Sequence, residues 1–215
     1  AGDGRVGLAE VEAPSQVAAD YVQTILSAKE VAFPKVERLF SYTTAPGRVE
    51  LKDAEPKAVP TVLFGVRPCE AKAFGALDAV FNWDYRDKFF NARIEKLTVI
   101  GASCTRADEA CFCTSVGGGP SDATGSDILL TPIDGGYLAE VCTEKGAAVV
   151  ALAPALFETG DGIDKAAVTA RVDLAFDQPA LTARLPGMFE SGVWVDQSLR
   201  CIGCGACAYV CPTCV

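Results

Sequence analysis

The pattern of apolar and polar positions predicts a strand–helix–strand unit in the middle of the chain. Two continuous apolar runs, TVLFGV at 61–66 and LTVIGA at 97–102, have the length and β-branched content of buried strands. Between them, the apolar residues of 69–81 recur at the spacing of one helix face, and 84–96 is a polar stretch of helical character. A strand, a helical crossover and a second strand in this order predict a parallel α/β unit.

Further elements are predicted on both sides of this unit. Apolar residues from Val17 to Leu26 recur at helical spacing after Ser15, a candidate N-cap, so we expect a helix over 15–30. A turn with a short amphipathic piece over 32–42 and a polar connector over 51–60 should follow. Beyond the central unit we expect strands at 127–133 and 136–143 and helices at 146–157, 164–176 and 177–189, the last interrupted at Pro186.

The composition indicates a folded chain without the features of a nucleic-acid or membrane protein. Its 215 residues, half of them hydrophobic, suffice for one domain with a small additional module. No apolar run approaches the roughly 20 residues that span a bilayer, and residues 1–14 lack the basic and apolar regions of a signal peptide. A net charge of −9 argues against nucleic acid and anionic membrane surfaces as partners. We therefore expect a cytoplasmic protein that does not span a membrane.

One phosphate-binding pattern near the N-terminus is set aside. Residues 2–7 read GDGRVG and match G-x-G-x-x-G. No strand precedes them, so the motif lacks the context that a dinucleotide-binding turn requires. We expect a flexible terminus there.

The chain contains ten cysteines and no histidine. Without histidine, this chain can supply neither a Ser-His-Asp or Cys-His catalytic centre nor a His-ligated zinc or haem. The cysteines are clustered, and their share is below the roughly 8–10% typical of small disulfide scaffolds. Metal-bound thiolates in a reducing compartment explain this distribution better than disulfides.

The C-terminal segment carries a specific metal-binding motif. Its cysteines follow the pattern C-x2-C-x2-C-x3-C at Cys201, Cys204, Cys207 and Cys211. With Pro212 directly after it, this is the bacterial ferredoxin run, which binds a 4Fe-4S cluster. Gly203 and Gly205 allow unusual backbone angles and a close approach of amides to sulfur. Structural zinc is the alternative, although zinc sites usually consist of two separated C-x2-C pairs.

Two points of this motif stay open in the sequence. In two-cluster ferredoxins the fourth cysteine of such a run ligates the other cluster, so Cys211 has two possible assignments. A partner run is absent before the chain stops at Val215. Cys214 is either an extra ligand or a free thiol.

A second, non-contiguous site is predicted at the ends of the central strands. Cys69 and Cys104 each follow a buried-strand run. Parallel neighbours lie about 4.8 Å apart, and their carboxyl ends open into the crevice where α/β folds bind ligands. Cys69 also begins a helix, where free amides stabilise a thiolate. The loop after Cys104 should return Cys111 and Cys113 to that crevice, helped by the glycines at 117–119.

Three interpretations of this four-cysteine set remain. The first is an iron–sulfur cluster, the second a zinc site with four cysteine ligands, and the third a set of unligated or redox-active thiols. The ferredoxin run elsewhere in the chain favours the cluster. Cys142 has no partner in a motif, so we interpret it as a structural residue.

Several segments together resemble a known family. They are SAKEVAFPKVERLFSY at 27–42, FGVRPCEAKAFGALDAVF at 64–81, IGASCTRADEACFCTSVGGGPSDATGSDILLT at 100–131, GYLAEVCTEKG at 136–146 and RCIGCGACAYVCPTC at 200–214. In this order they resemble the electron-transfer subunits of anaerobic sulfite reductase and of soluble sulfhydrogenases, where the similar chain is the β subunit. Related subunits accompany heterodisulfide-reductase-type complexes. The resemblance covers nearly the whole chain from about residue 27.

The resemblance implies an α/β fold in two parts. Residues 1–195 would form an N-terminal domain that contains a parallel sheet and carries a cluster at Cys69, Cys104, Cys111 and Cys113. Residues 196–215 would be the start of a ferredoxin-type 4Fe-4S module. Family members continue to a second cysteine run, so we expect this module to be truncated.

The resemblance also implies a function. The chain would pass electrons through two or more 4Fe-4S clusters, and these would link a flavin- and NAD(P)-binding subunit to a hydrogenase-, sulfite-reductase- or heterodisulfide-reductase-like subunit. It would carry no catalytic residues of its own. Two other classes stay open: a catalytic cluster-bearing subunit, for which Arg67 and Arg106 are the only candidate substrate contacts, and a zinc-stabilised interaction protein.

Overall fold

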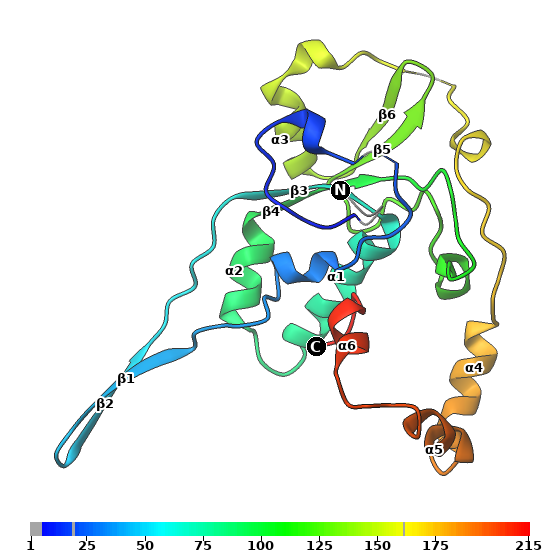
Figure 1. The fold of residues 1–215 in the computed structure, drawn as a ribbon. Coiled ribbons are helices and arrows are strands. Elements are labelled where there is room, and N and C mark those ends of the chain that lie inside the picture. The colour runs from blue at the N-terminus through cyan, green and yellow to red at the C-terminus, as the bar shows by residue number, and fades with distance from the viewer. Residues whose placement is uncertain (1–5, 19, 161) are drawn as a thin grey trace.

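A mixed four-stranded sheet forms the centre of the computed structural model, which describes residues 6–18, 20–160 and 162–215 (Figure 1). Its strands, in spatial order, are β3 (Thr61–Val66), β4 (Leu97–Ala102), β5 (Ile128–Ile133) and β6 (Gly136–Val141). The first three run parallel and β6 pairs antiparallel with β5. All four strands were expected from the apolar pattern, and the parallel pairing of the first two is confirmed. The fold is therefore of the mixed α/β kind.

Two helices form the crossover between β3 and β4. Helix α1 (Pro68–Phe81) begins with proline at its first position, where no backbone donor is lost. Helix α2 (Lys88–Lys96) is capped by Asp87, whose side chain accepts a hydrogen bond of 2.7 Å from the Phe90 amide. Both match the predicted helical stretches. A third helix, α3 (Glu144–Leu152), follows β6 and is continued by a 3-10 turn at Pro154–Leu156.

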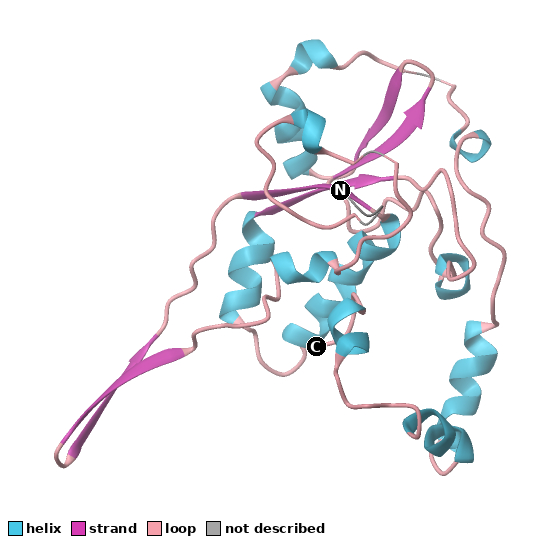
Figure 2. Ribbon diagram, in the orientation of Figure 1, coloured by secondary structure: helices cyan, strands magenta, loops and turns pink. Residues whose placement is uncertain are grey.

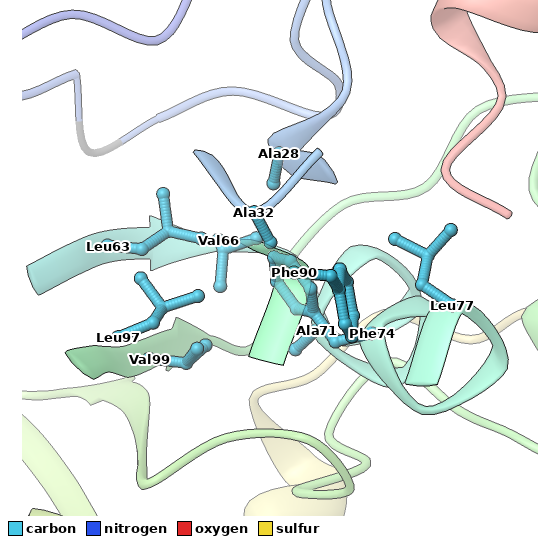
Figure 3. Packing of buried hydrophobic residues seen from close by; sticks show 10 residues of the cluster. All are labelled: Ala28, Ala32, Leu63, Val66, Ala71, Phe74, Leu77, Phe90, Leu97 and Val99. Carbon is cyan, nitrogen blue, oxygen red and sulfur yellow. The ribbon is translucent and has the colours of Figure 1, made fainter. Parts of the chain in front are cut away.

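The hydrophobic core lies between the sheet and these crossover helices (Figure 3). Buried side chains of β3, β4, α1 and α2 form it together with a short 3-10 helix at Ala28–Val31: Ala28, Ala32, Leu63, Val66, Ala71, Phe74, Leu77, Phe90, Leu97 and Val99. The Phe81 and Phe90 rings stack at 4.5 Å between centroids. This core fixes α1, and so the position of Cys69, against the strand ends.

The helix predicted over 15–30 is wrong in the described part of that segment. Only two 3-10 turns occur there, at Pro14–Gln16 and at Ala28–Val31. The residues between them follow an irregular path on which the Tyr21 hydroxyl donates to the Gly65 carbonyl and the Tyr21 carbonyl accepts from Arg67. These contacts with the strand end override a weak helical preference in a segment that contains several β-branched residues.

The amphipathic piece predicted over 32–42 continues into a β-hairpin that the sequence interpretation missed. Strands β1 (Phe40–Ala45) and β2 (Arg48–Asp53) pair antiparallel around Gly47, which has φ of 74°. Both strands are exposed along their whole length, and the hairpin projects away from the sheet (Figure 1). The polar connector expected over 51–60 therefore begins inside a strand.

The C-terminal third consists mostly of loops and short helices (Figure 2). The helix predicted over 164–176 is wrong: a single 3-10 turn forms at Lys165–Ala167, and the rest runs across the cysteine loop, where the Ala170 amide donates to the Cys104 carbonyl. The helix predicted over 177–189 is present as α4 (Gln178–Arg184) and a 3-10 turn at Leu185–Met188. Helices α5 (Gly192–Ser198) and α6 (Ala206–Val210) follow.

Two smaller points complete the fold. None of the described helices combines the length and apolar character that crossing a membrane requires. The glycine pattern at 2–7 lies largely outside the described residues.

Candidate metal centres

The ends of β3 and β4 bring Cys69 and Cys104 to the same edge of the sheet. Val66 pairs with Gly101 across the two parallel strands. Each cysteine lies three residues beyond its member of this pair. Cys69 is the second residue of α1, behind Pro68, whereas Cys104 begins a loop. The strand-end position expected for both residues is thus present in the fold.

The loop after Cys104 folds back on itself and against α1. The Cys104 amide donates to the Pro120 carbonyl at 2.8 Å, and the Gly118 amide donates to the Cys113 carbonyl at 2.9 Å. Gly117, with φ of 70°, ends the 3-10 helix at Cys113–Val116. The Lys72 ammonium of α1 donates to the Gly117 carbonyl and pairs with Asp122 at 3.2 Å. The glycine run therefore has the folding role expected of it.

Cys69 and Cys113 line one pocket of about 490 Å³ between α1 and this loop. Lys72 and Asp122 stand at its wall, and Thr213 of the C-terminal segment also reaches it. The two cysteines are 44 positions apart in the sequence, so only the folded chain brings them together. The pocket is larger than a single ion requires.

All four predicted cysteines of the α/β part influence one another electrostatically. Burial raises the pKa of Cys104 to about 11, and the Cys69, Cys113 and Cys111 thiols add to this shift. Burial also raises the pKa of Cys69, with further contributions from Glu70 and Cys113. Burial likewise raises the pKa of Cys111. These thiols hold their protons at neutral pH, so binding a metal there must release protons.

Arg67 places a buried positive charge beside this set. Its side chain is 7% exposed, and it donates to the Ser103 carbonyl at 3.2 Å. Its charge lowers the pKa of Cys104, against the larger effect of burial. Its Nε has no hydrogen-bond partner among the described residues. A buried cation with a donor left over suits an anionic group with sulfur acceptors, so the donor set and its surroundings fit an iron–sulfur cluster.

The C-terminal cysteines lie on a short exposed turn that leads into α6. Gly203 and Gly205 have φ of 70° and 72°, a region that favours glycine. The Gly203 amide lies 3.4 Å from Cys201 Sγ, which is the amide-to-sulfur approach expected from the sequence. Cys201, Cys204 and Cys207 are exposed and Cys211 is partly buried. The run thus presents its thiols outward, in a conformation that only the two glycines permit.

Cys211 and Cys214 form a coupled pair at the end of the described chain. Burial raises the pKa of Cys211, but hydrogen bonds from Cys214 and Thr213 outweigh it and lower the pKa to about 7. The hydrogen bond to Cys211 raises the pKa of Cys214, which the charge of Lys29 opposes. Lys29 is a site residue that the sequence analysis missed. It lies in a stretch that reads as an ordinary helix, and nothing in its pattern points to the cysteines.

The remaining candidates lie apart from these sites. Cys142 donates to the Glu140 carbonyl at 3.3 Å, and its pKa is raised by burial and by Glu140. Arg106 pairs with Asp20 at 2.7 Å on the exposed surface. No three Cys, Asp or Glu side chains within the described ranges converge on a point that would hold one ion. In a cubane each thiolate binds a different iron, so that kind of convergence is not required.

Comparisons with known proteins agree with these sites. The family "Fer4_2: 4Fe-4S binding domain" matches residues 191–213, which include α5, α6 and the ferredoxin run. "Sulfhydrogenase 2 subunit beta" of Pyrococcus furiosus is 30% identical over 216 residues, which cover 95% of this chain and 61% of that protein. The chain thus spans about three fifths of the length of this relative. No solved structure matches. The chain is therefore an iron–sulfur protein with a 4Fe-4S binding domain and a homologue of the sulfhydrogenase 2 β subunit.

Proposed function

We propose that this protein is an electron-transfer subunit of a multi-subunit oxidoreductase. It would link a flavin- and NAD(P)-binding subunit to a catalytic subunit of hydrogenase, sulfite-reductase or heterodisulfide-reductase type. The observation that carries this proposal is the presence of two cysteine sets in one chain whose relative is a sulfhydrogenase subunit. Bound 4Fe-4S clusters take up and release single electrons at potentials that the protein tunes.

The first set is proposed as the ligands of one cluster in the α/β part: Cys69, Cys104, Cys111 and Cys113. Their mutual electrostatic influence and the pocket shared by Cys69 and Cys113 support this assignment. Arg67 would balance part of the negative charge of the loaded site, and its free Nε–H is a donor for sulfur. Lys72 would fix the loop after Cys104 against α1.

The second set is proposed as the ligands of a cluster in the C-terminal module: Cys201, Cys204, Cys207 and Cys211. The match to a 4Fe-4S binding domain supports it. In this proposal residues 1–195 form the α/β domain and 196–215 the ferredoxin-type module. The second role for Cys211, as a ligand of a further cluster, would need cysteines beyond those of this run.

Two measurements on the full chain, reconstituted without oxygen, test the proposal. We expect about eight irons per chain, four for each site, and a broad visible absorption band that dithionite bleaches. The loaded chain should exchange electrons with a low-potential dye but should reduce neither sulfite nor NAD(P)⁺ by itself. Zinc in place of iron, with no visible band, would overturn the proposal and favour the interaction protein. Turnover by the isolated chain would instead favour the catalytic subunit.

A further inference from the structure

Lys29 connects the α/β part to the C-terminal cysteine segment. Its side chain is 7% exposed, although lysine is seldom buried. Its ammonium donates to the Ala208 carbonyl at 2.6 Å and to the Cys214 carbonyl at 2.7 Å. Ala208 lies in the last turn of α6, between Cys207 and Cys211. A single side chain thus contacts both ends of the segment that closes the ferredoxin run.

The backbone around Lys29 is anchored next to Cys69. The Glu70 carboxylate accepts from the Ser27 hydroxyl at 2.8 Å and from the Ala28 amide at 2.7 Å. Ser27 in turn caps the turn that carries Lys29. Glu70 is the neighbour of Cys69 in α1. A short series of hydrogen bonds therefore leads from one cysteine set to the other.

Other contacts place the C-terminal segment at the same location. Thr213 lines the pocket that Cys69 and Cys113 share, and Figure 1 shows α6 beside α1. The Lys35 ammonium lies 5.8 Å from the centroid of the Tyr209 ring of α6. Lys29 is the only one of these contacts that is both charged and buried, so it dominates the attachment.

The charge of Lys29 is unpaired by acidic side chains. Among the described residues its ammonium contacts backbone carbonyls and no carboxylate. Burying an ammonium without a counter-charge is costly, because carbonyl dipoles replace only part of its hydration. A nearby anionic group would offset that cost. The cysteine segment that Lys29 contacts is where the proposed function places such a group.

We propose that Lys29 is a positioning residue that fastens the C-terminal 4Fe-4S module to the α/β site and compensates the charge of its cluster. The inference rests on the proposed function for the presence of that cluster. Its two hydrogen bonds keep α6 and the Cys214 end against α1, beside the Cys69 pocket. Its positive charge favours the more negative, reduced form of the site and so raises its reduction potential.

The test compares three variants of the full chain, loaded with iron and sulfide without oxygen. Lys29→Met removes the charge and both bonds, and Lys29→Arg keeps the charge and donors. Lys145→Met is the matched control, because Lys145 also donates to two carbonyls, those of Ile94 and Leu97 at 3.0 and 2.8 Å. These carbonyls lie at the opposite end of β4 from Cys104. Lys29→Met leaves both cysteine sets unchanged, so the iron content shows that the protein folds and loads.

Two readouts decide the matter. In Lys29→Met we expect amide hydrogens of 206–214 to exchange roughly tenfold faster, since a bond from a charged donor contributes about this much stability or more. Electron paramagnetic resonance during a redox titration should show one cluster shifted to lower potential, with the other unchanged. Selective loss of about four irons in Lys29→Met would also support the proposal. Lys29→Arg and Lys145→Met should resemble the unmodified chain.

Contrary outcomes are separable from failure of the proposed function. If the unmodified chain binds no iron, the proposed function fails. If it binds iron and Lys29→Met keeps the exchange rates and both potentials, the clusters stand and the role of Lys29 is overturned. An equal effect in Lys145→Met would also overturn it, because the effect would then be general to buried lysine–carbonyl contacts.

Discussion

The Arg67 guanidinium lies over the Tyr21 ring, with its central carbon 3.9 Å from the ring centroid. This contact brings a residue from the N-terminal segment to the end of β3, directly beside Cys104. It covers one side of the candidate cluster site and removes Arg67 from solvent. The charge that the site requires is therefore held in place by a segment outside the cysteine motifs.

Replacing Arg67 with methionine should destabilise the chain by about 2–3 kcal/mol, because hydrogen bonds from a buried charged donor are lost. Urea unfolding of the metal-free chain measures this. Arg171→Met serves as the control, since Arg171 pairs with Asp173 on an exposed surface and should change stability by less than about 0.5 kcal/mol. Equal effects of the two substitutions would contradict the importance given to Arg67.

Serine in place of Cys69 or Cys113 should weaken the same metal site. We expect each variant to lose up to about four irons per chain and to keep the C-terminal cluster, because both thiols line one pocket. Iron analysis and electron paramagnetic resonance report this. Cys142→Ser should keep the full iron content. If Cys69→Ser binds as much iron as the unmodified chain while Cys113→Ser does not, another residue must supply the fourth ligand.

The metal-free chain should lose stability as the pH rises from about 9 toward 11. Burial raises the pKa of Cys104 from 9.0 to about 11, so the folded chain binds this proton more tightly than the unfolded chain does. The stabilisation is complete below pH 9 and is lost as Cys104 ionises. Unfolding free energies of the reduced chain between pH 8 and 11 test this. Cys104→Ser should show a shallower decline, and an identical slope would rule out the assignment to Cys104.

Replacing the hairpin 40–53 with a two-residue Asn-Gly turn should leave the stability of the remaining chain within about 0.5 kcal/mol. The Leu39 carbonyl already accepts from the Ala54 amide at 3.0 Å, so a short turn closes the gap. Both hairpin strands are exposed throughout. Thermal unfolding measures the change. A large drop in the melting temperature would show that the hairpin packs on the body of the protein.

The sheet and its crossover were predictable because their signal is local. Continuous apolar runs at 61–66 and 97–102 define buried strands wherever they occur, and the helix between them has a regular apolar face. The strand-end position of Cys69 and Cys104 followed from that topology. The hairpin was also readable, since Phe40 and Tyr42 alternate with polar residues, but the segment was interpreted as helical.

The errors fall where distant contacts decide the backbone. Residues 15–30 have a helical pattern, yet Tyr21 is bound by Gly65 and Arg67 from the strand end. Residues 164–176 contain Val168, Thr169 and Val172, and they are held across the cysteine loop by Ser115, whose hydroxyl accepts from the Ala175 amide at 2.8 Å. Lys29 is a similar case, because its partners lie about 180 positions away.

The two cysteine sets differ in when they come into existence. The C-terminal run spans a few consecutive turns, so it can bind iron as soon as that stretch has been synthesised. The other set is drawn from both sides of a parallel crossover and exists only after β3 has paired with β4. Maturation of this protein should accordingly be ordered: its α/β centre can be filled only in a chain that has already folded, whereas the ferredoxin run requires no such delay.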